Sequence, residues 1–162
     1  MRYSRSVRKL AGLGVLLVGC SGTAADASPK WTRVEAHCGY SFLAPPGVMV
    51  HAGQPFDSCL DDWTTRSCEY SGDYGLFSSE LEELKGSAQY TALQESIDGR
   101  AALVVTAADK ESLVAAVFFR EVDPAVEGIR LTISANCQDI AGQQDALKLF
   151  RSITFTAVGV EQ

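Results

Sequence analysis

The chain has 162 residues and a formal net charge of −6, with 14 basic against 20 acidic side chains. Hydrophobic residues make up 46% and charged residues 21%, a globular composition that argues against a disordered or low-complexity chain. This length suits one domain with a real core, and an acidic balance without a basic block argues against nucleic acid as a partner.

The first 19 residues have the order of a secretion signal. Four basic residues lie among residues 2–9, and an apolar run of ten residues, Leu10 to Gly19, follows them. Such a run is too short to span a hydrocarbon core about 30 Å thick, which takes about 20 residues. We therefore expect residues 1–19 to be a signal peptide that is removed on export.

The end of the apolar run carries a more specific motif. Leu17-Val18-Gly19-Cys20 resembles the lipobox of bacterial lipoproteins, in which Leu, a small or β-branched residue and then Gly or Ala precede an invariant Cys. The resemblance implies that Cys20 carries a diacylglycerol thioether, that cleavage occurs just before it, and that the new amine is acylated. Each buried methylene of such chains contributes about 0.8 kcal/mol to membrane anchorage. In that family an Asp after the cysteine favours the inner membrane. Ser21 stands there instead, so we expect the outer membrane, with the inner membrane as the alternative, and a domain that faces the periplasm.

The sequence divides the rest of the chain into a tether, a domain and a tail. Residues 20–30 hold the lipidated cysteine and then small, polar residues without periodicity, which predicts a flexible tether. A single α+β domain is expected over residues 31–157, with a tail at 158–162. Residues 1–19 hold four of the 14 basic residues and no acidic one, so the mature chain carries a net charge of −10. Attraction to anionic lipid therefore does not explain membrane attachment, and acylated Cys20 is the expected contact with the bilayer.

The remaining cysteines are predicted to form two disulfides. Lipidation of Cys20 accounts for the odd total of five, and the oxidising space outside the cytoplasm favours pairing of the other four. Three pairings are open; the preferred one joins Cys59 to Cys68 across a short loop and Cys38 to Cys137 between two strands. The chain has no CxxC or zinc-module spacing, so structural disulfides are favoured over redox or metal chemistry.

The folded part is predicted to begin with strands. Residues 38–43 alternate and end at the turn signal of residues 44–47, and residues 48–50 are expected to form a short strand. Residues 51–67 have no consistent period and predict a long loop. Residues 68–77 are rich in aromatic side chains and predict a further strand.

A short helix and a hairpin are predicted next. The Ser-Glu-Leu-Glu segment at 79–82 matches a capping box, which predicts a helix start. Asp98-Gly99 is the preferred dipeptide of a tight turn, so residues 90–97 and 100–107 should pair as a hairpin. Asp109-Lys110 is expected to turn the chain into the following strand.

The last third of the chain has the clearest patterns. Residues 113–122 are apolar on both faces and predict a central strand covered on both sides, whereas residues 129–137 alternate strictly. Asp139 is placed to cap a helix, and residues 152–155 predict a closing strand. The expected apolar side of this helix carries Ile140, Gln143, Leu147 and Phe150. Together these elements predict one α+β domain with a mainly antiparallel sheet and about two helices.

Three short motifs resemble the PsbP-like superfamily, which is named for an extrinsic protein of photosystem II. They are Tyr40-x-Phe42-x-Ala44-Pro45, the hairpin of residues 97–101, and ALKLFRSITF at residues 146–155. The resemblance spans much of residues 40–155 and implies an α/β/α sandwich whose known members mostly bind partners rather than catalyse. The segment between Cys59 and Cys68 is not part of the shared pattern, so it is the place where any specialised function is to be sought.

The sequence offers few residues for catalysis. It has only two histidines, His37 and His51, and no HExxH, phosphate-loop or dinucleotide motif. Ser41 follows a partial nucleophile-elbow motif that lacks the second Gly, and we interpret it as a strand residue. His37 and Cys38 are neighbours on a predicted strand, so their side chains should point to opposite faces. We therefore predict no catalytic residue, no metal and no cofactor.

The acidic segment 57–73 is the most unusual part of the domain. Trp63 and Tyr70 lie between its acidic residues, and Tyr74 adjoins it. An EF-hand register read from Asp57 fails because Cys59 stands at the third position, so calcium is disfavoured. A solvated acidic loop is favoured, and the functional alternative is a partner-binding surface with Trp63, Tyr70 and Tyr74 as anchors. The acidic residues are Asp57, Asp61, Asp62, Glu69 and Asp73.

The lack of a nucleophile–base pair or metal-ligand cluster favours a membrane-anchored, non-catalytic lipoprotein, a periplasmic binding or assembly module of unknown ligand for which an envelope protein is a candidate partner. A small hydrolase that uses the carboxylates of residues 57–73 is the first alternative, and it predicts a deep pocket with two of those acids. A purely structural envelope lipoprotein is the second alternative, and it predicts neither a pocket nor an exposed aromatic patch.

Overall fold

The structure is a computed structural model that describes residues 30–53, 58–109, 112–123 and 126–156. The predicted signal peptide, Cys20, nearly all of the predicted tether and the predicted tail lie outside the described residues. Asp57 and Lys110 also lie outside them.

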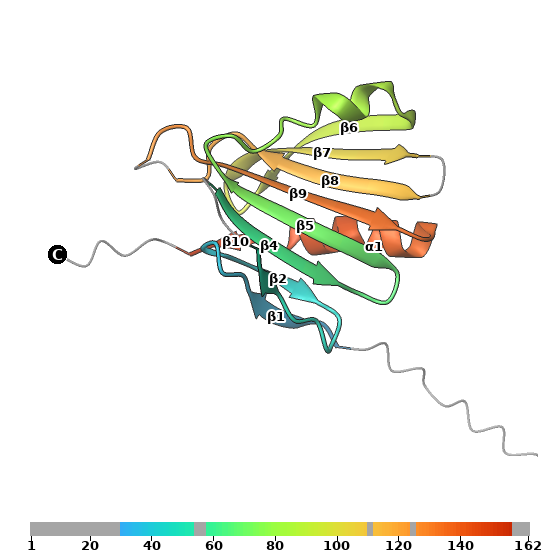
Figure 1. Cartoon of the computed structure of the whole chain (residues 1–162), viewed down its shortest axis with the longest axis horizontal. Helices are drawn as coiled ribbons and strands as arrows, with labels where there is room; N and C mark the ends of the chain where they lie inside the picture. Colours follow the sequence, from blue (N-terminus) through green and yellow to red (C-terminus); the bar gives the residue numbers. More distant parts are fainter. Residues whose placement is uncertain (1–29, 54–57, 110–111, 124–125, 157–162) are drawn as a thin grey trace, which may run out of the picture.

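Two antiparallel sheets and one α-helix make up the described part (Figure 1). The larger sheet has the strand order β3-β4-β5-β9-β8-β7-β6, and the smaller one has the order β1-β2-β10. The elements are β1 (Thr32–Glu35), β2 (Tyr40–Ala44), β3 (His51–Ala52), β4 (Ser58–Thr64), β5 (Cys68–Gly75), the 3-10 helix η1 (Glu82–Gly86), β6 (Ala88–Ile97), β7 (Arg100–Ala108), β8 (Leu113–Phe119), β9 (Arg130–Cys137), α1 (Ile140–Arg151) and β10 (Thr154–Phe155).

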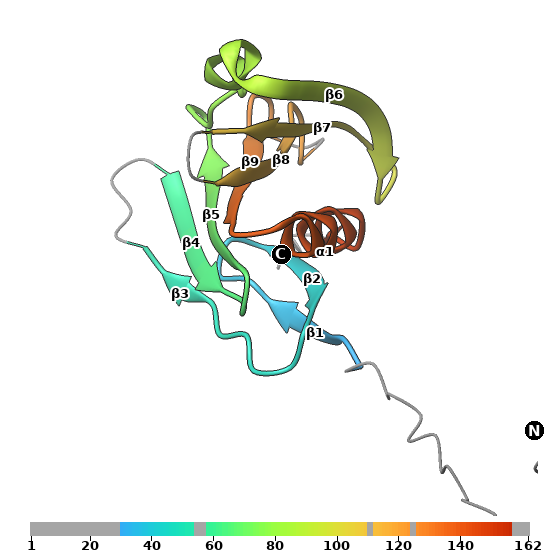
Figure 2. The ribbon, with the colours of Figure 1, turned by 90° about the vertical axis from the view of Figure 1, so that its right-hand side faces the viewer.

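The core lies between the larger sheet on one side and α1 with β2 on the other. Figure 2 shows the sheet curving around α1, with β1 and β2 below the helix. Tyr40 and Phe42 of β2 and Leu149 and Phe150 of α1 are all fully buried there. A smaller cluster on the opposite face of the sheet packs Leu81, which precedes η1, against β7 and β8. The predicted α+β class with a mainly antiparallel sheet is confirmed.

Several local predictions are confirmed as well. Asp98 and Gly99 have φ values of 49° and 74°, as a two-residue hairpin turn requires, and they join β6 to β7. The Asp139 side chain caps α1, because its Oδ1 accepts a hydrogen bond from the Gly142 amide at 2.7 Å. β9 forms where strict alternation predicts it, and β8 is buried on both faces.

The prediction of about two helices is wrong, because the described part contains one α-helix and only a short 3-10 helix. Ser79 does not complete the expected capping box: its hydroxyl accepts from the Leu81 amide and donates to Glu83, not Glu82. Leu81 has a φ of 62°, so the backbone turns left-handed where an α-helix would have to begin. The predicted apolar side of α1 is also partly wrong, since Ile140 is 66% exposed.

The long loop predicted for residues 51–67 is wrong. These residues contain β3 and β4, and β4 pairs along its whole length with β5. Asp61 and Trp63 of β4 both point into the core, whereas Asp62 and Thr64 are exposed. Buried and exposed residues do alternate along β4. The alternation cannot be seen in the hydrophobicity of the sequence, because the buried position 61 holds a carboxylate in place of an apolar side chain.

The preferred disulfide pairing is also wrong. The structure joins Cys38 to Cys59 and Cys68 to Cys137. Cys59 lies at the far end of β4, opposite Tyr74, so strand pairing carries it away from Cys68. Cys68 instead lies directly opposite Cys137 on β9.

Two disulfides indicate an oxidising compartment outside the cytoplasm, since thiols inside it are kept reduced. Within the described ranges, no helix combines the length and apolar character needed to cross a bilayer.

Candidate functional site

The aromatic residues proposed as anchors lie mainly in the core. Trp63 is 1% exposed and Tyr70 is 4% exposed, and Tyr74 is half-buried. Trp63 and Tyr70 lie opposite each other in the β4–β5 pair, with ring centroids 5.1 Å apart, and Trp63 also stacks on Phe42 at 4.8 Å. A binding anchor must be accessible to its partner, so Trp63 and Tyr70 are not available as anchors, and of the three residues only Tyr74 is partly exposed.

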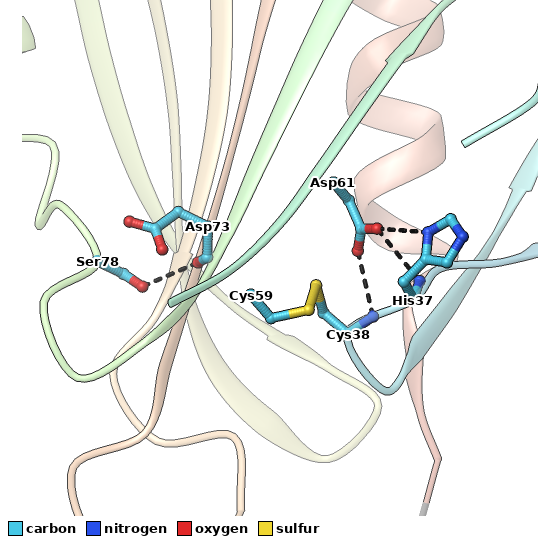
Figure 3. Close-up of a disulfide and its surroundings, with 6 residues drawn as sticks. All are labelled: His37, Cys38, Cys59, Asp61, Asp73 and Ser78. Carbon is cyan, nitrogen blue, oxygen red and sulfur yellow. Dashed lines mark hydrogen bonds and ion pairs between the residues drawn. A yellow bond between two sulfur atoms is a disulfide. The ribbon is translucent and has the colours of Figure 1, made fainter. Parts of the chain in front are cut away.

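Asp61 is the most buried of the acidic residues that the sequence analysis singled out (Figure 3). Its carboxylate accepts hydrogen bonds from the backbone amides of His37 and Cys38 at 3.2 and 3.3 Å, and from His37 Nδ1 at 3.0 Å. The Cys38–Cys59 disulfide fastens the same two segments. Three donors compensate the buried charge, so Asp61 and the disulfide together hold the turn before β2 against β4.

Tyr40 is fully buried beside the Asp61 carboxylate, on the core side of this cluster. Burial, and then the negative charge of Asp61, raises the pKa of its hydroxyl far above the ordinary value. A Cβ at Gly72 would lie 2.5 Å from that hydroxyl, so only glycine fits at this point of β5. The buried hydroxyl makes no well-formed hydrogen bond within the described residues. Asp61 and Tyr40 are therefore closed to solvent, whereas the half-exposed His37 side chain and the half-buried Cys59 reach the surface.

Two of the other acidic residues face outward. Asp62 and Glu69 line a hollow of about 320 Å³ on the face of the sheet away from α1, together with His51 and Ser71. Neither carboxylate makes a side-chain hydrogen bond or ion pair within the described part. A hydrolase needs one carboxyl group protonated as the acid and the other ionised as the nucleophile, and no such contact here distinguishes the two. No group of three or more His, Cys, Asp or Glu side chains among the described residues is arranged to hold a metal ion.

A more promising surface lies at the end of the sheet that carries the β6–β7 turn. Two hollows there, of about 540 and 470 Å³, share Arg120 and Glu121, which follow β8. The first hollow is completed by the turn residues Asp98–Ala101, and the second by residues that lead into β9. We define the hairpin-end surface as Asp98–Ala101, Arg120, Glu121, Glu127, Gly128 and Arg130, together with the adjoining Leu76 and Phe77.

Ion pairs and hydrogen bonds hold the arginines of the hairpin-end surface in place. Glu80 binds Arg120 and Arg130 through separate carboxylate oxygens, each at 2.9 Å. Arg100 donates from Nε to the Val122 carbonyl at 2.8 Å. Arg120 remains 71% exposed although it is paired. These guanidinium groups are therefore positioned before any partner arrives.

Apolar side chains border the same surface. Leu76 and Phe77 follow β5 and are 50% and 73% exposed. A Cβ at Gly128 would lie 3.3 Å from Leu76, so Leu76 adjoins the second hollow, and Phe77 is its neighbour in the chain. Phe77 was not predicted from the sequence, because its aromatic side chain suits the single strand expected over residues 68–77, whereas β5 ends at Gly75.

No family model matches the chain, and no curated protein matches it. Among solved structures, the fold is similar to that of the Saccharomyces cerevisiae Ran-binding protein Mog1p, with 13% sequence identity and a TM-score of 0.49 over 79% of this chain and 96% of that one. A mutant of protein Mog1 has the same identity and TM-score, with 81% and 98% of the two chains covered. A likeness at this level carries no argument about function.

Proposed function

We propose that this protein is an exported lipoprotein, anchored in the bilayer by acylated Cys20, whose acidic domain is a non-catalytic binding module for another envelope protein. The lipid anchor is supported chiefly by the way the five cysteines are distributed. The other four are paired with each other, so Cys20 is left over, and it stands at the last position of the lipobox motif. In this reading residues 1–19 are the signal peptide and residues 20–30 are the tether.

The hairpin-end surface supports binding of a protein rather than a small anion. Its arginines lie beside Asp98, Glu121 and Glu127, so the local charge is mixed. Arg and Phe are enriched at protein interfaces, where an aromatic ring fills a pocket and a guanidinium binds carboxylates or carbonyls. We infer a partner that offers an apolar pocket to Phe77 and acceptor groups to Arg120. The PsbP-like motifs imply the same class of function.

The binding surface is tested by crosslinking in intact bacteria that express the full chain. Phe77→Ala and Arg120→Glu should each reduce a specific adduct at least fivefold, because they remove the exposed ring and reverse the most exposed guanidinium. Met49→Ala is the matched control for the ring, since Met49 is 70% exposed and lies outside the hairpin-end surface. Lys85→Glu, at an exposed ion pair of η1, is the control for the charge reversal.

An adduct that survives both test variants would overturn this choice of surface. A wild-type protein that gives no adduct at all would favour the purely structural alternative. The anchor is tested separately: Cys20→Ser should abolish acyl labelling and leave the precursor uncleaved, and normal labelling of that variant would refute the assignment.

A further inference from the structure

The basic residues of the described part fall into two groups. The first group forms ion pairs with carboxylates and consists of Lys85, Arg100, Arg120, Arg130 and Arg151. The second group makes no ion pair within the described part and consists of Lys30, Arg33, Arg66 and Lys148. Acidic side chains outnumber basic ones in this chain, 20 to 14, so a shortage of acids does not explain the unpaired cations.

The unpaired cations lie around the point where the chain enters the domain. Lys30 and Arg33 flank the start of β1, and Trp31 lies between them in the chain. The ammonium group of Lys148 lies over the Trp31 ring, 3.8 Å from its centre. Trp31 and Arg66 line the same hollow of about 360 Å³. Lys30, Arg66 and Lys148 therefore meet on one face, although they are far apart in the sequence.

We call Lys30, Trp31, Arg66, Asp145 and Lys148 the tether-end face. Its three cations are exposed, and Trp31 is half-buried. Asp145 is the only carboxylate among the residues that line the hollow. The face therefore has a local positive charge, in contrast to the net charge of −6 of the whole chain.

The tether brings this face, rather than any other, to a bilayer. The lipid on Cys20 belongs to the proposed function, on which this inference rests, and residues 21–30 connect it to Trp31. Ten extended residues span at most about 35 Å, so the face at the end of the tether stays near the headgroups. A Lys or Arg close to an anionic lipid surface strengthens the attraction about fivefold, over a Debye length of about 10 Å. An anionic bilayer is therefore a complementary surface that is always within reach.

We propose that the tether-end face lies against the anionic headgroups of the membrane that holds the anchor. Arg66 and Lys148 then contact lipid phosphates, and the Trp31 ring lies at the level of the headgroups, where tryptophan is enriched in membrane proteins. The same headgroups repel the acidic remainder of the domain, so this face turns toward the lipid. The lipid on Cys20 provides the attachment, and the charge of the tether-end face sets the orientation of the domain.

This orientation leaves the hairpin-end surface free for a protein partner. Figures 1 and 2 both show the start of β1 far from the end of β8, and Arg120 directly follows β8. When the start of β1 faces the membrane, the hairpin-end surface is held away from the headgroups.

Quenching of tryptophan fluorescence by lipid tests the contact. The chain has two tryptophans, and Trp63 is 1% exposed in the core, so lipid can reach Trp31 but not Trp63. The lipidated full chain is placed in vesicles of phosphatidylcholine and phosphatidylglycerol whose acyl chains carry bromine near the headgroup, with unbrominated vesicles as the reference. Wild type should be quenched, and the quenching should fall about fivefold in Trp31→Phe and in vesicles of brominated phosphatidylcholine alone.

A pair of charge-reversed variants tests the electrostatic part of the proposal. Arg66→Glu/Lys148→Glu should lower the quenching about fivefold, because two attracted groups become repelled ones. Lys85→Glu/Arg120→Glu is the matched control, since it changes the net charge by the same amount at exposed positions outside the tether-end face. The control and Phe77→Ala should both retain the wild-type quenching.

Flotation of the same vesicles in a density gradient separates this proposal from the lipid anchor. A wild-type chain that does not float with the vesicles would refute the anchor, and the tether-end contact with it. A chain that floats while Trp31 stays unquenched would overturn the contact alone, and would leave this face to the tether or to a protein. Equal quenching of Arg66→Glu/Lys148→Glu and wild type, or of wild type in neutral and anionic vesicles, would also overturn the proposal.

Discussion

Removal of the two disulfides, one at a time, should cost different amounts of stability. The sequence separations are 21 residues for Cys38–Cys59 and 69 for Cys68–Cys137. The chain-entropy relation gives about 3.3 and about 4.4 kcal/mol for loops of these lengths. The loops follow one another without overlap, so their effects should add to about 8 kcal/mol. That sum is comparable with the whole stability of a typical domain, about 5–15 kcal/mol.

Urea unfolding of the paired alanine variants checks these magnitudes. Cys68→Ala/Cys137→Ala should be about 1 kcal/mol less stable than Cys38→Ala/Cys59→Ala, and the variant without all four should not fold. Burial acts in the same direction, since Cys68 and Cys137 are 3% and 1% exposed while Cys59 is half-buried. Thiol labelling checks the pairing itself: Cys38→Ala alone should free Cys59. Labelling at Cys137 instead, or the reverse order of stability, would refute the reasoning.

Three further predictions concern single side chains. Trp63→Ala should cost about 3–5 kcal/mol in urea unfolding, because the ring is fully buried against Phe42 and Tyr70; a loss below about 1 kcal/mol would contradict the packing. Hydrogen bonds from Arg151 lower the pKa of Glu95 in the folded protein. The ion pair therefore adds at most about 1 kcal/mol to the free energy of unfolding. This stabilisation is present above the ordinary pKa of a glutamate and is lost as the pH falls through the pKa of the folded state. Glu95→Gln should therefore differ from wild type near pH 7 and converge with it in acid, whereas a difference independent of pH would argue against the pair. Burial raises the pKa of Tyr70 to about 12 from 10.0, so stability should fall as the pH rises from about 10 to 12; an identical alkaline unfolding midpoint for Tyr70→Phe would refute this.

Features with a local cause were predictable from the sequence. The Asp98-Gly99 turn and the Asp139 cap depend on the conformational and hydrogen-bonding preferences of a few adjacent residues, and both form. β9 was predictable because its inward positions are apolar and its outward ones polar. In each case the local pattern agrees with the tertiary environment.

Features set by long-range contacts were not predictable. β4 was missed because Asp61 faces inward, where amides and a ring from a segment more than 20 residues earlier compensate its charge. The disulfide pairing follows strand register, which places Cys68 opposite Cys137. The hairpin-end surface joins Phe77, Arg120 and the β6–β7 turn from three separate connections, and no local pattern brings them together.

The mass of the N-terminal peptide of the protein purified from membranes tests the account most directly. We predict a mature chain that begins at Cys20, with a diacylglycerol thioether on its sulfur and an acyl chain on its amine. A peptide that still joins Gly19 to Cys20, or one in which Cys20 carries no lipid, would contradict it.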